Sequence, residues 1–562
     1  MTSFKDFSNV CEIVDTLTSS LEITDVVACF LKSIESQEEI SIAVYFMLGK
    51  VFPEWSDKEI GIGVGILYSA LSKASNTTVE EIEEIVRTTG DIGKAASIVL
   101  DNNQKKQVTF ASFSEDKVDL SLKNVYERFD MIAKASGTRS QSEKIKHLRY
   151  LFNSVSKKEA RYLSYIAIEE FKIGVGEGII RNAIAKAFDT PSHVIERGFM
   201  LTNDFGIVAI AAKKGGENEV SKLEIKLHHP IKVMFSGVVE NIESVINELD
   251  HVAIEWKFDG ARVQIHKEGD KVTIFSRRLE NITKSLPDVV EEVKASVLEH
   301  SIILDGEVIA IDESNNLLSF QDLLKRFRRK HNVETIAKKI PLILNVFDII
   351  YLNGKTLIDL SLINRRKLLK KSIKDTEKVK LCNQMLTNDL HIINVIYDQA
   401  LKAGHEGIMI KDPNSIYTLG KRSKNWMKKK PIMDTLDLVV IGAEWGYGRR
   451  TNMIGSYTIA CKNDNEFLSL GKVGTGIADE VLSVLTKRFS DFILFESGSE
   501  IEIKPEIVFE IAFEEIQRSK NYNSGYALRF PRFVRVRDDK SKDEINTIES
   551  IKEQYDAQHK GV

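Results

Sequence analysis

The sequence predicts a multidomain α+β protein with an all-helical N-terminal part, a mixed α/β centre and a C-terminal part of short antiparallel strands. Up to about Phe188, apolar residues recur at helical spacing, as in Val26–Leu31 and Val125–Ala133. From His251 onward they alternate with polar residues, which is the pattern of strands. A chain of 562 residues is also too long for one hydrophobic core, so we expect two to four domains.

The composition is that of an ordinary folded protein and excludes several classes. Hydrophobic residues make up 43% of the chain and charged residues 28%, which excludes a disordered protein. The net charge of −4 gives no indication of nucleic acid, so a DNA-binding face would have to come from local clusters of cations. No apolar run is long enough for a signal core or a membrane span, and we expect a cytoplasmic protein. The scattered cysteines argue against a zinc module and a disulfide framework: Cys11, Cys29, Cys382 and Cys461.

Two glycine-containing loops in the helical part precede helices. They are residues 137–144 (Gly-Thr-Arg-Ser-Gln-Ser-Glu-Lys) and 172–178 (Lys-Ile-Gly-Val-Gly-Glu-Gly). Backbone amides at helix N-termini suit phosphate oxygens, although ordinary connections between helices fit the pattern equally well. By itself a helical array also fits a protein-binding scaffold. Farther on, residues 213–218 (Lys-Lys-Gly-Gly-Glu-Asn) predict an exposed loop between domains.

The centre is organised around residues 255–262 (Glu-Trp-Lys-Phe-Asp-Gly-Ala-Arg), which place Lys257 where a strand runs into a tight turn. An amine attacks phosphorus only when deprotonated, and nearby positive charge from Arg262, Arg277 or Arg278 would favour that form. Alternation and the Gly269-Asp270 turn predict a meander of three strands, His251–Trp256, Arg262–Lys267 and Lys271–Phe275.

Further strands of the centre carry polar residues. Ile302–Ile309 places Asp305 and Glu307 on one face. Leu342–Ile350 places Phe347 and Asp348 at a strand end. In Glu406–Lys411 the two terminal side chains point to opposite faces. A helical insertion is expected at Phe320–His331, and Lys421–Lys430 is densely basic. Each piece has an ordinary explanation as a turn, a core aromatic or a solvated face.

The C-terminal part predicts a small barrel of short strands. The alternating segments are Leu436–Tyr447, Ser456–Lys462, Phe467–Gly474 and Ile507–Phe513. The tail at Leu528–Arg537 interleaves arginines with aromatic residues, a combination that suits phosphate contact.

As an ordered set, these motifs resemble the ATP-dependent DNA ligases of the covalent nucleotidyltransferase superfamily, most closely the long archaeal type. The matching motifs are Lys257-x-Asp-Gly-x-Arg262, Ser276-Arg277, Asp305-Gly-Glu307, Phe347-Asp348, Glu406-Gly-x-Met-x-Lys411, Trp426-x-Lys428-x-Lys430 and Arg537-x-Asp-Lys540. Residues 227–235 depart from the family pattern and indicate only a domain boundary. The resemblance implies a helical DNA-binding domain (1–215), a nucleotidyltransferase or adenylation domain (226–431) and an OB-fold β-barrel (432–562).

The resemblance also implies a mechanism and its residues. Lys257 attacks the α-phosphorus of ATP to form lysyl-AMP, AMP passes to the 5′-phosphate of a nick, and the 3′-hydroxyl displaces it. Glu255 lines the base pocket, Phe347 stacks on adenine and Glu307 holds the ribose hydroxyl. Phosphates of the nucleotide or of the DNA end are contacted by Arg262, Arg277, Arg422, Lys428, Lys430, Arg537 and Lys540. Glu406 and Asp259 coordinate Mg²⁺. The implied DNA contacts are Ser140, Gln141, Lys144, Gly174, Gly176 and Arg181.

The implied partners are ATP, nicked double-stranded DNA and a sliding clamp, with the enzyme a monomer serving DNA replication, repair and recombination. An RNA ligase or a GTP-using capping enzyme shares the lysine motif, but the long helical part argues against both. The missing cysteine cluster disfavours an NAD-dependent ligase. A non-catalytic end-bridging protein would not need Lys257, Glu307, Glu406 and Lys428 together. Gly354-Lys355-Thr356 lacks the upstream glycine of a P-loop, which disfavours a hydrolytic motor.

Overall fold

A computed structural model describes every residue except 107–119, 138, 172, 240, 313, 328–332, 432–433, 447–449, 451–452, 465 and 560–562. Thr138 and Lys172 of the two expected phosphate loops therefore lie outside the described residues, as do 328–331 of the expected helical insertion and Tyr447 of an expected strand. The chain divides into two units, Met1–Lys429 and Lys430–Val562, and each is described by itself.

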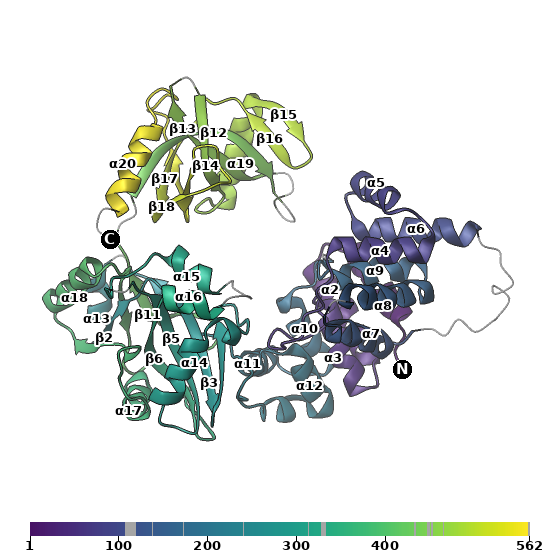
Figure 1. Cartoon of the computed structure of the whole chain (residues 1–562), viewed down its shortest axis with the longest axis horizontal. Coiled ribbons are helices and arrows are strands. Elements are labelled where there is room, and N and C mark those ends of the chain that lie inside the picture. The colour runs from purple at the N-terminus through teal and green to yellow at the C-terminus, as the bar shows by residue number, and fades with distance from the viewer. Residues whose placement is uncertain are drawn as a thin grey trace. The chain divides into compact units, whose positions relative to one another are not determined.

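The N-terminal region is helical, as the apolar spacing predicted (Figure 1). Side-chain caps begin several of the helices. Thr78 and Glu81 form a reciprocal capping box on α5, and Ser156 and Glu159 form one on α9. The helices are α1 Phe4–Asp15, α2 Ser20–Ser33, α3 Gln37–Met47, α4 Val64–Ser75, α5 Val79–Thr89, α6 Ile92–Lys106, α7 Leu122–Lys134, α8 Ser140–Ser154, α9 Lys157–Ala167, α10 Glu177–Ala187, α11 Ser192–Thr202 and α12 Phe205–Val220. None of the described helices is both long and apolar enough to cross a membrane.

The loop expected at 213–218 is shorter in the structure, where two helical segments that together make up α12 meet at a kink. The helix breaks only at Gly215 and Gly216, where Gly216 adopts a positive φ of 59°. Glycine has no Cβ, so this backbone kink costs little there. Val220 beyond the kink is buried in the helical core, and that packing explains why the chain resumes its helix.

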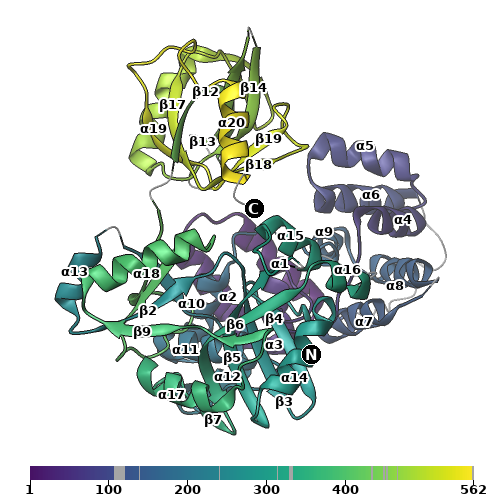
Figure 2. The ribbon, with the colours of Figure 1, turned by 60° about the vertical axis from the view of Figure 1, so that its left-hand side comes forward.

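The central region contains two β-sheets (Figure 2). The first has the order β1-β11-β10-β2-β9, and the second has the order β4-β3-β5-β6-β7 with β8 beside β6. The strands are β1 Phe235–Val238, β2 Val252–Lys257, β3 Ala261–Glu268, β4 Lys271–Ser276, β5 Ser301–Ala310, β6 Leu342–Leu352, β7 Lys355–Thr356, β8 Val379–Leu381, β9 Gln384–Thr387, β10 Gly407–Lys411 and β11 Arg422–Lys429. The helices are α13 Ile242–Glu248, η2 Thr283–Ser285, α14 Pro287–Ser296, α15 Phe320–Phe327, α16 Val333–Lys339, α17 Leu362–Ser372 and α18 Leu390–Lys402.

Apolar side chains fix which face of the first sheet is covered. Ile254 of β2 and Ile408 of β10 pack with Val245 of α13 and Ile393 of α18. On the opposite face, Ala253 of β2 joins a cluster that includes residues of β5, β6 and β11. Because side chains alternate along a strand, Glu255 and Lys257 lie on the same face as Ala253, toward the second sheet.

The expected three-strand meander is half right. β3 and β4 form the predicted hairpin, but β2 pairs with β10 and β9 in the other sheet. The turn after Lys257 therefore carries the chain from one sheet to the next. A Cβ on Gly260 would lie 2.4 Å from the carbonyl oxygen of Val308, so only glycine permits this close passage.

Two strand-end expectations are also wrong. β6 continues to Leu352 because Ile349 and Ile350 extend its buried apolar run, so Phe347 and Asp348 lie within the strand. Glu406 lies just before β10 and not in it, since its backbone N–H donates to the carbonyl of Lys257 (2.9 Å) in the connection to that strand.

The C-terminal unit is rich in short antiparallel strands, as expected. Its main sheet has the order β14-β13-β12-β16-β15, and β17 joins β12 to β20. Among the described residues, β14, β15 and β20 each have one sheet partner, so these pairings do not form a closed ring. The strands are β12 Asp434–Trp445, β13 Ile454–Asn463, β14 Glu466–Val473, β15 Ile493–Ser497, β16 Glu500–Ile503, β17 Val508–Phe513, β18 Glu515–Arg518, β19 Tyr526–Arg529 and β20 Arg532–Val536. The helices, which the sequence did not predict, are α19 Asp479–Phe489, η4 Ser490–Phe492 and α20 Ile548–His559.

Candidate active site between two sheets

Lys257 ends β2 and forms an ion pair with Glu406, with 2.5 Å between Nζ and Oε2. Backbone pairing sets this distance, because Gly407 lies opposite Lys257 in the β2–β10 ladder. Gly407 has a φ of +126°, and a Cβ there would lie 2.2 Å from the carbonyl oxygen of Lys429. Only glycine fits at position 407, and this close approach of β10 places the carboxylate of Glu406 beside Lys257.

Glu307 approaches the same place from the second sheet. It lies opposite Arg262 in the β3–β5 ladder. Burial raises the pKa of Glu307 to about 8, although the positive charges of Lys257 and Arg262 act in the opposite direction. The carboxyl is therefore mostly protonated at neutral pH and can donate a hydrogen bond as well as accept one.

Arg262 is engaged in a polar network within the central region. Its Nε and Nη2 donate to the two carboxylate oxygens of Asp305 at 2.9 and 2.6 Å, and Nη1 donates to the carbonyl of Met234 at 2.6 Å. The hydroxyl of Tyr417 donates to Asp305 at 2.6 Å. Bidentate pairing of this kind fixes the plane of the guanidinium. The nucleotide contact expected of Arg262 stays a prediction.

Glu255 belongs to a buried ion pair beside two aromatic rings. Its Oε2 lies 2.5 Å from Nζ of Lys411, and Gln384 donates to its Oε1 at 2.7 Å. Lys411 Nζ also lies 4.8 Å from the ring centroid of Phe347 and 4.1 Å from that of Trp426. The side chains of Glu255 and Lys411 are both nearly inaccessible to solvent, so this ion pair forms a fixed polar surface beside Phe347.

The central region also holds two more of the predicted cations, Lys428 and Arg277, and the second predicted metal ligand. Lys428 lies opposite Met409 of β10, which in turn lies opposite Glu255 of β2, so Lys428 shares the face of the Lys257 site. Arg277 lines a cavity of about 480 Å³ with three other basic residues, Lys50, Lys232 and Arg278, and two acidic ones, Glu54 and Glu280. Asp259, the second expected metal ligand, lies in the turn between β2 and β3.

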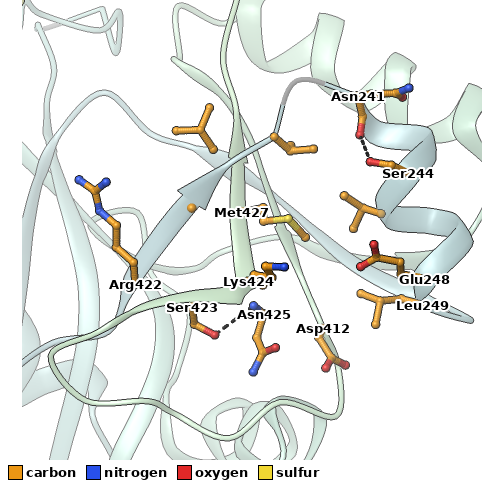
Figure 3. A pocket seen from close by; sticks show the side chains of 14 residues that line it. Asn241, Ser244, Glu248, Leu249, Asp412, Arg422, Ser423, Lys424, Asn425 and Met427 are labelled. Carbon is orange, nitrogen blue, oxygen red and sulfur yellow. Dashed lines mark hydrogen bonds between the residues drawn. The ribbon is translucent and has the colours of Figure 1, made fainter. Parts of the chain in front are cut away.

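Arg422 is the first predicted phosphate ligand of the basic run at the end of the central region. It begins β11 and lines a cavity of about 570 Å³ beside α13, together with Glu248 and Met427 (Figure 3). The phosphate contact expected of Arg422 stays a prediction.

Three expected phosphate ligands belong to the C-terminal unit. Nζ of Lys430 lies 2.7 Å from Oε1 of Glu514. Arg537 and Lys540 both form ion pairs with Asp437, at 2.8 and 2.7 Å. These three cations are thus each held by a carboxylate of their own unit.

The expected DNA contacts lie at two helix starts. Ser140 and Gln141 open α8, and Gly176 caps α10; neither helix has a side-chain cap. Their first amides remain suited to phosphate. Gly174 has a positive φ of 78°, and Arg181 pairs with Glu196 at 3.2 Å. Nζ of Lys144 donates to the carbonyls of Ile60 and Gly61, and the DNA contact expected of Lys144 stays a prediction.

The sequence analysis gave no role to three residues that the structure places at the site, Lys411, Gln384 and Tyr417. Lys411 carried a signal, because it is the last residue of the Glu406-Gly-x-Met-x-Lys motif. Gln384 and Tyr417 carried none, because they reach the site from β9 and from the loop before β11. No group of three or more metal-binding side chains occurs in the part of the chain that the structure describes.

Comparison with known proteins covers nearly the whole chain. The family models "DNA ligase N terminus", "ATP dependent DNA ligase domain" and "ATP dependent DNA ligase C terminal region" match residues 3–185, 233–430 and 450–540. The chain is 55% identical to a DNA ligase of Methanococcoides burtonii, over 99% of each chain. It is 52% identical to DNA ligase 2 of Methanosarcina mazei over 100% of each, and 46% identical to a DNA ligase of Archaeoglobus fulgidus over 99% of each. A solved structure, Pmar-Lig_PreS3, has a TM-score of 0.55 at 18% identity and covers 94% of this chain and 99% of that one.

Proposed function

This chain belongs to the ATP-dependent DNA ligase family, and from that premise we propose that it seals nicks through adenylation of Lys257. The observation that carries the proposal is the meeting of Lys257 at the end of β2, Glu406 just before β10 and Glu307 of β5 in the second sheet. One nucleophile, one carboxylate for a cation and one carboxyl for a sugar hydroxyl are the groups that nucleotidyl transfer requires.

In the first step Lys257 attacks the α-phosphorus of ATP. Its ammonium loses a proton and its contact with Glu406, an N–P bond forms, and the bond to the β-phosphate breaks with its electron pair leaving on pyrophosphate. Lys428 would balance the negative charge that develops on the α-phosphate, since it lies on the same face of the first sheet.

The base and the ribose of the nucleotide would be held by different residues of the pocket. Phe347 offers its ring for stacking on adenine, and Glu255 with Lys411 forms the polar surface beside it. Glu307 would hold the ribose hydroxyl. Its protonated form can donate to the hydroxyl oxygen, and its ionised form can accept the hydroxyl proton.

The residues present fit a magnesium ion. Glu406 and Asp259 supply two carboxylates near Lys257, and Mg²⁺ is commonly held by one or two carboxylates together with phosphate oxygens. When bound, the ion would offset the charge of the triphosphate and polarise the α-phosphate.

The later steps use the same pocket for a different acceptor. AMP leaves Lys257 for the 5′-phosphate of a nick, forming a pyrophosphate link as the N–P bond breaks. The 3′-hydroxyl then attacks the DNA phosphate, its proton is lost and AMP departs. Arg277, in its basic cavity, is suited to the 5′-phosphate, and the uncapped starts of α8 and α10 to the duplex backbone.

The proposal includes three domains: a helical DNA-binding domain over 1–215, an adenylation domain over 226–431 and an OB-fold barrel over 432–562. The twelve described helices α1–α12, the two central sheets and the strand-rich C-terminal unit support it. We also propose a cytoplasmic monomer recruited by a sliding clamp. Four free thiols support the reducing compartment.

One assay tests the proposed function. The purified protein is incubated with Mg²⁺ and ATP, GTP or NAD, each labelled in the phosphate that would be transferred, and then with a nicked duplex. Label on the protein from ATP, followed by sealing, is the expected result. Label from GTP alone would favour a capping-type enzyme, and nick binding without any label would favour a non-catalytic end-bridging protein.

A further inference from the structure

Asp437 of β12 lies between the two cations of the C-terminal unit that are assigned to the phosphates of ATP. Nη1 of Arg537 lies 2.8 Å from Oδ1 and 2.9 Å from Oδ2 of Asp437, and Nζ of Lys540 lies 2.7 Å from Oδ2. A single carboxylate therefore takes hydrogen bonds from both cations. A phosphate would need the same donors, because carboxylate and phosphate oxygens compete for guanidinium and ammonium groups.

The rest of Arg537 is also occupied. Its Nε and Nη2 donate to the two carboxylate oxygens of Asp539 at 2.9 and 2.7 Å, and a carboxylate oxygen of Glu510 lies 4.0 Å from its Nη1. Two carboxylates thus account for all three nitrogens of the guanidinium. An incoming polyphosphate cannot simply add to this arrangement and has to displace at least one of them.

Asp437 is held more firmly than Asp539. The backbone N–H of Asp437 donates to Oδ1 of Asn546 at 2.8 Å, and the backbone carbonyl of Asp437 accepts from the N–H of Asn546 at 3.0 Å. It also pairs with Glu510 in the β12–β17 ladder. The Asp437 side chain is mostly buried (14% exposed), whereas that of Asp539 is 61% exposed. Asp437 is therefore a fixed competitor and Asp539 an exposed one.

We propose that Asp437 is a positioning residue for adenylation that competes with the pyrophosphate part of ATP for Arg537 and Lys540. The inference rests on the proposed function and on the phosphate contact that the family resemblance implies for these two cations. Before ATP binds, Asp437 holds both side chains in ordered positions. After the bond between the α- and β-phosphates breaks, Asp437 forms its ion pairs with Arg537 and Lys540 again and so favours the departure of pyrophosphate. Asp437 sets the affinity of the enzyme for both compounds without touching either.

Asp437→Asn in the full-length protein tests the competition, because an amide keeps the shape but loses the charge. The rate of Lys257 adenylation is measured against ATP concentration, and loss of the adduct is measured against pyrophosphate concentration. The half-saturating concentrations of both should fall by about two- to fivefold, as expected for loss of a competing partly exposed ion pair. Sealing of a nick that already carries 5′-AMP should not change. Asp543→Asn is the matched control, because it removes a carboxylate of the same unit that pairs with Lys462 at 2.7 Å.

Two comparisons separate the possible failures. Arg537→Ala and Lys540→Ala should raise the half-saturating ATP concentration; if neither does, the proposed role of the cations is wrong whatever Asp437 does. If they do, but Asp437→Asn leaves both half-saturating concentrations unchanged or raises them while melting like the unmodified protein, competition by Asp437 is overturned. Should Asp437→Asn unfold, Asp437→Ser is measured in the same way and decides by the same outcomes.

Discussion

A lysine that forms a phosphoramidate must give up a proton, and the partner that holds the side chain of Lys257 before that moment is Glu406, at 2.5 Å. Lys257→Arg should keep this ion pair and the fold, but a guanidinium stays protonated and cannot attack. Label transfer from ATP should fall by at least about a thousandfold, measured on denaturing gels. Lys271→Arg, an exposed lysine at the start of β4, serves as the control. An acid-labile AMP adduct on the Lys257→Arg protein would mean that another residue is the nucleophile.

The carboxyl of Glu307 makes stability depend on pH. Burial raises its pKa from 4.5 to about 8, so the folded protein keeps a proton that the unfolded chain releases. This contribution is complete below pH 4.5 and is lost as the pH rises through about 8. Between pH 6 and 9, the Glu307→Gln protein should therefore have a free energy of unfolding roughly 1–3 kcal/mol higher than that of the unmodified protein. Urea unfolding at each pH measures this difference. Exposed Glu334→Gln is the control, and parallel curves for Glu307→Gln and the unmodified protein would contradict the shifted pKa.

The site could be predicted from sequence as far as its motifs reach. Lys257, Glu307 and Phe347 were found because each stands in a short ordered motif. Gln384 and Tyr417 were not found, because their contacts with Glu255 and Asp305 depend on strand register across more than 100 residues of chain. Register is fixed by the burial of whole strands, and a local pattern does not contain it.

At the scale of the element, Gly407 is the first residue of β10 and lies opposite Lys257 in the β2–β10 ladder. An alanine there would need a φ of +126° and would place its Cβ 2.2 Å from the carbonyl oxygen of Lys429. Gly407→Ala should lower the free energy of unfolding by about 2–4 kcal/mol and reduce label transfer by shifting Glu406. Gly354→Ala isolates the backbone effect, since Gly354 has a φ of +87° with open space around it, and should cost only about 1 kcal/mol. Equal losses in urea unfolding for the two variants would show that the close contact is unimportant.

The alternation of residues identified most central strands but not their partners. β3 and β4 were predicted as a hairpin because a Gly-Asp turn joins them, and the structure agrees. β2 carried the same alternation and a similar turn, yet it pairs with β10, which lies about 150 residues farther along the chain. A turn near the core can connect strands of two sheets as readily as strands of one. What distinguishes them here is the contact of Gly260 with β5, which is a tertiary property.

For the whole molecule, the order of helical, mixed and strand-rich regions followed from periodicity alone. The helix caps and the apolar spacing act locally, so a helical region up to about Phe188 could be predicted. The helical segment beyond Gly216 depends instead on burial of Val220. In the C-terminal unit, α19 and α20 were missed. Leu482 and Leu485 of α19 and Ile551 of α20 are buried against the strands, and this packing is not visible in segments that short.

At the scale of the whole molecule, we expect Arg537 and Lys540 to act in one step of the reaction only. Pyrophosphate exists when Lys257 is adenylated and is absent when the 3′-hydroxyl attacks the adenylated 5′-phosphate. Replacing both cations by alanine should therefore slow adenylation by about a hundredfold or more, the usual effect of losing charge that stabilises a leaving group. Sealing of a nick that already carries 5′-AMP should fall less than about threefold.

Both rates are measured on one preparation, with nick binding determined separately. Arg450→Ala, which removes a surface cation of the same unit that pairs with Asp479, controls for a general loss of charge. Because Asp437 would be left without its two partners, thermal melting of the double variant must also be compared with that of the unmodified protein. If both steps slow by the same factor in a protein that melts normally, Arg537 and Lys540 support every step of the reaction, and their assignment to pyrophosphate is wrong.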